Sequence, residues 1–116
     1  MAGRTKTRVV LVTCGSPGEA RKIAKAVVGK RLAACVNMVS APVQSVYRWK
    51  GKVESAKEIL LVVKTTATRL KELEKVIARL HSYEVPEFLV LAVEAGSEGY
   101  LRWVQQSVSG KAGRAR

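Results

Sequence analysis

An extended apolar segment over residues 32–66, LAACVNMVSAPVQSVYRWKGKVESAKEILLVVKTT, constrains the fold more than any other part of the chain. At its middle stands Lys50-Gly51, and glycine supplies the positive φ that a tight hairpin turn needs. The segment therefore predicts two long antiparallel strands that meet at this dipeptide. Pro42 cannot donate a ladder hydrogen bond, so we expect the first of these strands to bend or bulge there.

The length of this hairpin predicts an oligomer. If residues 33–49 were extended at ~3.3 Å each they would span roughly 55 Å, about twice the width of a domain whose expected radius of gyration is ~13 Å. The hairpin must therefore bend or project. Its tip carries Val46, Tyr47 and Trp49, which one small domain cannot easily cover. We expect a neighbouring subunit to bury them.

The part of the chain before the hairpin predicts one strand and one helix. The β-branched run VVLVT, which follows Arg8, is typical of a short buried strand. Ser16 can then cap a helix, Pro17 suits its first position, and Glu19 completes a capping box. We expect this helix to end near Gly29.

After the hairpin, apolar residues at intervals of three and four predict a second amphipathic helix from Leu70 to His81. Pro86 stops this helix, and EFLVLAVEA, residues 87–95, predicts a fourth strand. Ser97 is suited to cap a last helix.

The predicted order is strand, helix, strand, strand, helix, strand and an extra helix, which is an α+β, ferredoxin-like βαββαβ fold with a C-terminal helix. Right-handed crossovers place the first strand between the third and the fourth. Cys14 and Cys35 then lie about two strand spacings apart, roughly 10 Å, too far for a disulfide. We expect one domain over residues 8–109, with disordered basic ends at 1–7 and 110–116.

The net charge of +12 does not by itself predict a nucleic-acid-binding protein. Six of the 21 Lys and Arg residues stand near the two ends, namely Arg4, Lys6, Arg8, Lys111, Arg114 and Arg116. Nonspecific nucleic-acid binding by these ends is kept as an alternative, and it would be steeply salt-dependent. The chain shows neither a membrane span nor the apolar run of a signal peptide, so we expect a cytoplasmic protein with reduced cysteines and no membrane partner.

The common signatures of catalysis are missing from the sequence. GxxxxGK[ST], GxGxxG, HExxH, CxxC pairs and GxSxG are all absent, and there is one histidine and no aspartate. We therefore expect no enzymatic activity.

The stretch HSYEVPE, residues 81–87, holds the single histidine and has two interpretations. As a structural residue, His81 in the last turn of a helix would satisfy free carbonyls and complement the helix dipole, worth roughly 0.3 to 1 kcal/mol. As a ligand, its imidazole with Glu84 or Glu87 and a thiolate from another strand would suit copper or zinc. Lys64, at the end of an apolar strand, either reaches solvent or offers its charge to an anion or a buried glutamate.

Five stretches of the chain, in order and spacing, resemble the CutA family of divalent-cation tolerance proteins. They are EARKIAKAVVGKRLAACVNMV, SVYRWKGKV, EILLVVKTT, HSYEVPEFLVL and GYLRWV, and they lie between Val9 and Val104. The resemblance implies a ferredoxin-like subunit in a tight homotrimer, built like PII-like signalling proteins, with a role in tolerance of copper and other divalent cations. A PII-like trimer that binds a small anion in its intersubunit clefts, through Lys64, is the alternative.

The resemblance also implies where a ligand would bind. The family's recurrent cleft residues correspond to Cys35, Tyr47, Trp49, Lys64, His81, Tyr83, Glu84, Pro86 and Glu87 of this chain. We predict weak copper or other divalent-cation binding through His81 with Cys35, Cys14 or Glu84, and ligand contacts from Tyr47, Trp49, Lys64, Tyr83, Glu84 and Glu87.

The chain departs from the family's pattern at three positions. The family usually has proline after the histidine, where this chain has Ser82. Members proposed to bind copper can carry a cysteine on the first strand and two adjacent histidines, where Val12 and Leu80 stand here. These differences are why the expected metal binding is weak.

Overall fold

The computed structural model describes residues 5–110 and has a mixed α+β architecture. Its elements are β1 (Thr7–Cys14), α1 (Pro17–Gly29), β2 (Cys35–Met38), β3 (Val43–Trp49), β4 (Lys52–Thr66), a 3-10 turn (Ala67–Arg69), α2 (Leu70–Leu80), β5 (Leu89–Ala92) and α3 (Glu98–Ser107). The strands pair antiparallel in the order β2-β4-β1-β5, and β3 extends the pairing along β4. The predicted ferredoxin-like fold, with the first strand between the third and the fourth, is confirmed.

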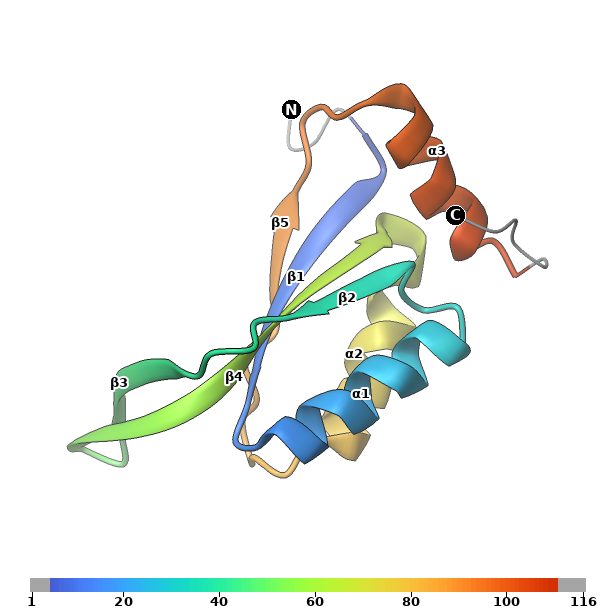
Figure 1. Cartoon of the computed structure of the whole chain (residues 1–116). Coiled ribbons are helices and arrows are strands. Elements are labelled where there is room, and N and C mark those ends of the chain that lie inside the picture. Colours follow the sequence, from blue (N-terminus) through green and yellow to red (C-terminus); the bar gives the residue numbers. More distant parts are fainter. Residues whose placement is uncertain (1–4, 111–116) are drawn as a thin grey trace.

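The predicted break of the second strand at Pro42 is also confirmed. This strand consists of β2 and β3, which pair with different halves of β4. At the far end of the hairpin Lys50 has φ 51° and Gly51 has φ 81°, the pair of positive values that a two-residue type I′ turn requires. The hairpin leaves the body of the domain (Figure 1), and the overall extents are 44 × 32 × 25 Å.

Only one face of the sheet is covered by α1 and α2 (Figure 1). Because side chains alternate along a strand, every second residue of β1 and β4 points to these helices. That side forms the core, whose fully buried members include Val10, Val12, Leu61, Val63, Ile23 and Leu73. The opposite face, which we call the open face, carries the apolar side chains of Val9, Leu11, Leu60, Val62, Leu89 and Leu91, all half-buried or exposed.

The predicted capping box of α1 is half formed. Ser16 Oγ accepts a hydrogen bond from the backbone N–H of Glu19 at 3.2 Å, as expected. The carboxylate of Glu19 does not return to Ser16. It accepts instead from the backbone N–H of Ser82, 63 residues away, at 2.8 Å. Ser82 can make this bond because it has a backbone N–H, which a proline at this position would lack.

The ordered domain begins earlier than predicted. β1 starts at Thr7, and the hydroxyl of Thr5 donates to the carbonyl of Val93 at 2.7 Å, so residues 5–7 are held to the sheet rather than disordered. The rest of the two predicted basic ends, residues 1–4 and 111–116, lies outside the described residues. Cys14 and Cys35 are both free thiols, as expected. No helix between residues 5 and 110 combines the length and apolar character needed to cross a membrane.

Candidate functional site

The predicted site residues occupy three places in the structure. Tyr47, Trp49, Tyr83, Glu84 and Glu87 gather around one open groove. The predicted metal ligands do not lie together. Cys14 and His81 are close to each other behind this groove, whereas Cys35 lies on β2. Lys64 lies opposite Cys35, on the neighbouring strand β4.

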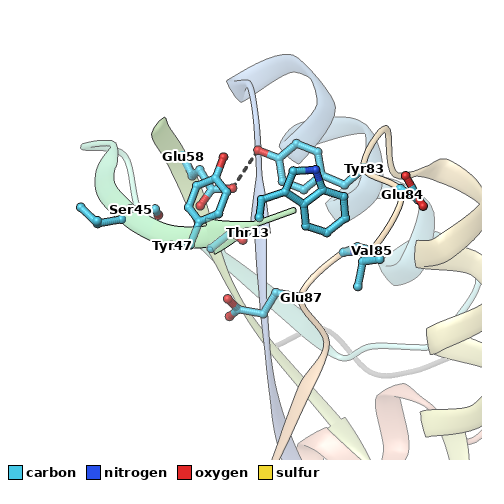
Figure 2. A pocket seen from close by; sticks show the side chains of 11 residues that line it. Thr13, Ser45, Tyr47, Glu58, Tyr83, Glu84, Val85 and Glu87 are labelled. Carbon is cyan, nitrogen blue, oxygen red and sulfur yellow. Dashed lines mark hydrogen bonds between the residues drawn. The ribbon is translucent and has the colours of Figure 1, made fainter. Parts of the chain in front are cut away.

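The groove lies where the hairpin leaves the sheet (Figure 2) and encloses about 710 Å³. Three of its lining residues are aromatic, Tyr47, Trp49 and Tyr83, and three are acidic, Glu58, Glu84 and Glu87. Thr13, Ser45, Val46, Val85 and Pro86 complete the lining. None of these residues is a Lys, Arg or His. We call it the carboxylate groove.

Glu58 is the buried centre of the carboxylate groove. The residue is only 7% exposed, and its Oε2 accepts a hydrogen bond from the hydroxyl of Tyr83 at 2.7 Å (Figure 2). Burial, followed by this hydrogen bond and the negative charge of Glu58, raises the pKa of Tyr83 well above its usual range. Burial and the charge of Glu58 also raise the pKa of Glu87. The groove therefore concentrates negative charge that nothing in its lining neutralises.

Glu87→Gln is expected to raise the melting temperature slightly at pH 7 and to leave it unchanged near pH 4. A carboxyl whose pKa is raised by folding keeps its proton longer in the native state. Folding then loses stability as the pH rises from the ordinary value of 4.5 through the raised one, and the amide removes this loss. Thermal unfolding from pH 4 to 7 measures the effect. Glu72→Gln, an exposed change of equal charge on α2, should show no such pH-dependent gain.

His81 is a buried residue that ties two elements together. The residue is 8% exposed, and Nε2 of its imidazole lies 2.7 Å from the carbonyl oxygen of Thr13 on β1. A carbonyl can only accept, so Nε2 carries the proton and Nδ1 accepts from the backbone N–H of Tyr83 at 3.1 Å. His81 is the C-cap residue of α2, and its backbone N–H donates to the carbonyl of Ile77, but its ring binds a carbonyl of the neighbouring strand β1 rather than one of its own helix.

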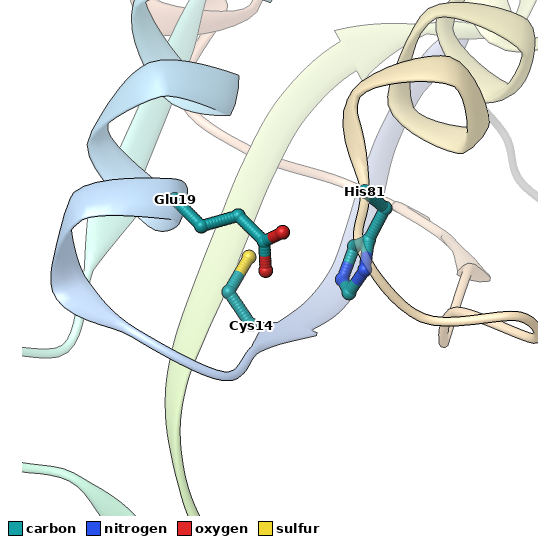
Figure 3. A group of neighbouring side chains, drawn as sticks. All are labelled: Cys14, Glu19 and His81. Atoms are coloured by element: carbon teal, nitrogen blue, oxygen red, sulfur yellow. The ribbon is translucent and has the colours of Figure 1, made fainter.

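Three metal-ligand side chains converge beside α1 and α2, and we call them the Cys–Glu–His cluster. Cys14 from β1, Glu19 from α1 and His81 after α2 point toward one another (Figure 3), with their ligand atoms all within 4.8 Å. Ligand atoms around a tetrahedral zinc ion are separated by about 3.3 to 3.8 Å. The most widely separated of these atoms would have to approach one another, by up to roughly 1 Å, to share an ion.

The Cys–Glu–His cluster contains one ionised side chain, Glu19, beside a Cys14 thiol that keeps its proton. Burial, and then the charges of Glu19 and Glu58, raise the pKa of the Cys14 thiol to about 12. Burial alone would raise the pKa of Glu19, but hydrogen bonding from Ser82 outweighs it and holds this pKa below its ordinary value. Glu19 Oε1 is buried without a hydrogen-bond partner. A negatively charged oxygen with no donor is a free position for a cation.

Lys64 and Cys35 lie away from both places. They pair with each other across β4 and β2. Glu58 stands six residues from Lys64 on the same strand, about 20 Å along it. Within one subunit, the structure therefore does not bring Cys35 to His81 or Lys64 to the glutamates. An anion in the carboxylate groove would find three acidic side chains and no basic one in its lining.

Two charged residues of these sites, Glu58 and Glu19, were not among the site residues predicted from sequence. Glu58 starts the apolar run EILLVV, and alternation along that strand places it on the same face as Lys64. Two charged residues on the same otherwise apolar face of a strand could have indicated Glu58 as a candidate site residue. Glu19 was predicted only as a capping residue, and nothing in its local sequence indicates that its carboxylate reaches Ser82.

The fold and these sites define a class: a ferredoxin-like α+β protein with an acidic, aromatic groove on one side of its sheet and cation-ligand side chains on the other. Comparison with known proteins gives the family. The family model described as CutA1 divalent ion tolerance protein matches residues 8–107. The chain therefore belongs to the CutA1 family.

Individual relatives agree with this assignment. Protein CutA of Mus musculus is 45% identical over 95 residues, which cover 82% of this chain and 53% of the mouse protein. Divalent-cation tolerance protein CutA of Thermus thermophilus is 46% identical over 99 residues, covering 85% of this chain and 95% of that protein. The chain thus spans about half of the mouse protein and nearly all of the bacterial one. The solved structure of the divalent cation tolerance protein (Cut A1) from Thermus thermophilus matches with a TM-score of 0.82 at 46% identity, covering 84% of this chain and 94% of that one.

Proposed function

We propose that this chain acts in divalent-cation tolerance as a cytoplasmic, non-enzymatic homotrimer that binds a divalent cation weakly. The observation that carries the proposal is the convergence of Cys14, Glu19 and His81, with ligand atoms within 4.8 Å. The family description and the name of the Thermus thermophilus relative, a divalent-cation tolerance protein, support it. Thiolate and imidazole ligands together suit copper and zinc.

The weakness of this binding follows from the hydrogen bonds that a metal would replace. The imidazole of His81 would have to give up its bond to Thr13 or to Tyr83, and the Cys14 thiol would have to lose its proton. Glu19 Oε1 alone can bind a cation without breaking a hydrogen bond. The residues fit a cation by their chemistry, and the cost of rearranging them lowers the affinity.

The trimer is supported by two apolar surfaces that a single subunit leaves uncovered. On the open face, Leu89 is 55% exposed and Leu91 is 48% exposed, both on the edge strand β5. On the projecting hairpin, Val46 and Val53 are exposed as well. An apolar sheet face next to an unpaired edge is typically buried by another chain.

Zinc titration calorimetry under reducing conditions tests the metal proposal. Cys14→Ala and Glu19→Gln are each expected to weaken zinc binding at least about tenfold, because each removes a ligand atom. Cys35→Ala is the matched control, since it removes the other free thiol on β2, and it should leave the affinity unchanged. Equal losses for Cys14→Ala and Cys35→Ala, or no loss for either ligand variant, would reject the cluster as the site.

A further inference from the structure

A polar pocket lies at the end of the sheet far from the hairpin turn, between the 3-10 turn that precedes α2 and the end of α3 (Figure 1). It encloses about 400 Å³, which is the size of a small-molecule site. We call it the basic pocket, and the polar residues of its lining are Lys6, Thr66, Thr68, Arg69, Gln105 and Ser109. Among the described residues, this lining has two positive charges and three hydroxyl groups but no carboxylate. Its composition therefore suits an oxyanion.

The register of the sheet brings the two positive charges to the same space. Thr7 of β1 pairs with Thr66 of β4, and the backbone N–H of Ala67 continues this pairing by donating to the carbonyl of Lys6 at 2.8 Å. Lys6 thus lies beside the 3-10 turn, although the two are far apart in the sequence. Because Arg69 belongs to this turn, both cations line the basic pocket.

The guanidinium of Arg69 is held in place by the end of α3. Its Nε donates to the carbonyl of Val108, the C-cap residue of α3, at 2.7 Å. This bond leaves its two terminal nitrogens, which have no acceptor among residues 5–110. A guanidinium can donate two parallel hydrogen bonds to two oxygens of one anion. Since Arg69 is already fixed, little side-chain freedom is lost when it binds such an anion.

The hydroxyl groups of Thr66 and Thr68 provide a further donor. Their oxygens lie 3.0 Å apart, so one hydroxyl donates to the other. Thr66 is only 3% exposed, and a buried hydroxyl proton without an acceptor is costly, whereas Thr68 is exposed. Thr66 is therefore the donor of this bond. The proton of Thr68 has no acceptor among the described residues and is available to an oxygen atom in the basic pocket.

We propose that the basic pocket binds the phosphate group of a small molecule, with Arg69 and Thr68 donating to its oxygens and Lys6 facing its charge. Two cations match the nearly two negative charges that a phosphate monoester carries at pH 7, whereas a carboxylate carries one. The pocket is larger than a phosphate ion, so an organic part of the ligand also fits.

This site is separate from the other sites of the chain. All of its residues come from one subunit, and none of them belongs to the apolar surfaces assigned to the trimer contact. Lys64, the residue of the alternative anion site, does not line it. The proposal does not depend on metal binding at the Cys–Glu–His cluster.

Titration calorimetry of the full chain with sodium phosphate and with glycerol 3-phosphate, at an ionic strength kept constant with sodium chloride, tests the proposal. Saturable binding of one molecule per subunit is expected. Glycerol 3-phosphate that binds more tightly than phosphate would place an organic part in the pocket, and equal affinities would place the phosphate group alone there.

Variants identify the residues responsible. Arg69→Gln is expected to weaken binding of both phosphate compounds at least about tenfold, because a charge and paired donors are lost. If Arg69→Gln does not fold, Lys6→Gln at an exposed position should still lower the affinity severalfold. Thr68→Val should weaken binding, and Thr68→Ser, which keeps the hydroxyl, should not. Lys71→Gln is the matched control, since it makes the same change in net charge at an exposed position of α2 outside the lining.

Three results would overturn the proposal. One is the absence of saturable binding of both phosphate compounds to the unchanged chain. Another is sodium acetate binding as tightly as sodium phosphate, which would assign the basic pocket to carboxylates. The third is an equal loss for Lys71→Gln and Lys6→Gln, which would reduce the effect to overall charge.

Discussion

Leu89→Lys/Leu91→Lys is expected to be a monomer in native mass spectrometry, whereas the unchanged chain is expected to be a trimer. Both side chains lie on the open face at the edge strand β5 and are about half exposed in one subunit. Burying a leucine side chain gains about 1.5 to 3 kcal/mol, and this gain would be lost at each of the two positions in every subunit. Placing unpaired ammonium groups in an apolar interface adds several kcal/mol more.

Val28→Lys is the matched control for this experiment. Val28 is an exposed apolar residue of α1, on the side of the sheet that the helices cover, so lysine there should leave the trimer intact. Circular dichroism of both variants would show that the subunit still folds. A trimer that persists in the leucine variant, or a monomer for the unchanged chain, would contradict the assignment of the open face to the interface.

His81→Ala is expected to lower the free energy of unfolding by roughly 2 to 4 kcal/mol, because the carbonyl of Thr13 and the N–H of Tyr83 each lose a partner in a buried place. Urea unfolding at a fixed protein concentration measures this loss. A histidine that acted only on the helix dipole would contribute about 0.3 to 1 kcal/mol. The two interpretations of this residue therefore predict effects of different size.

A second variant separates the two hydrogen bonds of His81. Glutamine can still donate from its amide to Thr13 but offers no acceptor at the position of Nδ1. His81→Gln should therefore lose roughly half as much stability as His81→Ala. If both variants lost less than about 1 kcal/mol, the ring would not tie β1 to the segment that follows α2.

The parts of the fold that follow from local chemistry could be predicted from the sequence. Gly51 allows the turn, Pro42 breaks the strand, and Ser16 caps α1, because each of these effects involves only a few neighbouring residues. Strand order followed from the handedness of crossovers. The predicted strand begins at Val9, two residues after β1 starts, because the bond from Thr5 to Val93 that holds this end joins residues far apart in the chain.

The candidate site could be predicted less completely, for the same reason. The resemblance to the family indicated which residues recur, and six of these do line the carboxylate groove. The partner of His81 could not be predicted, because the ring reaches Thr13, 68 residues away. Similarly, Cys14 rather than Cys35 lies near the ring, since only the register of β1 against β4 decides which thiol is close.

The two sites lie on opposite sides of the sheet and are joined by Tyr83. Its backbone N–H binds Nδ1 of His81, and its hydroxyl binds Glu58 in the carboxylate groove. The rings of His81 and Tyr83 also lie 4.7 Å apart, centroid to centroid. A cation that took Nδ1 of His81 would therefore release one of the bonds that position Tyr83 in the groove.

The most direct test of the proposed function is a crystal structure of the full chain soaked with zinc, with anomalous diffraction recorded on both sides of the zinc absorption edge. The proposed function predicts a trimer with an anomalous peak bounded by Cys14, Glu19 and His81 in each subunit. A trimer whose zinc peaks lie only at other residues, or a lattice without a threefold assembly, would contradict it.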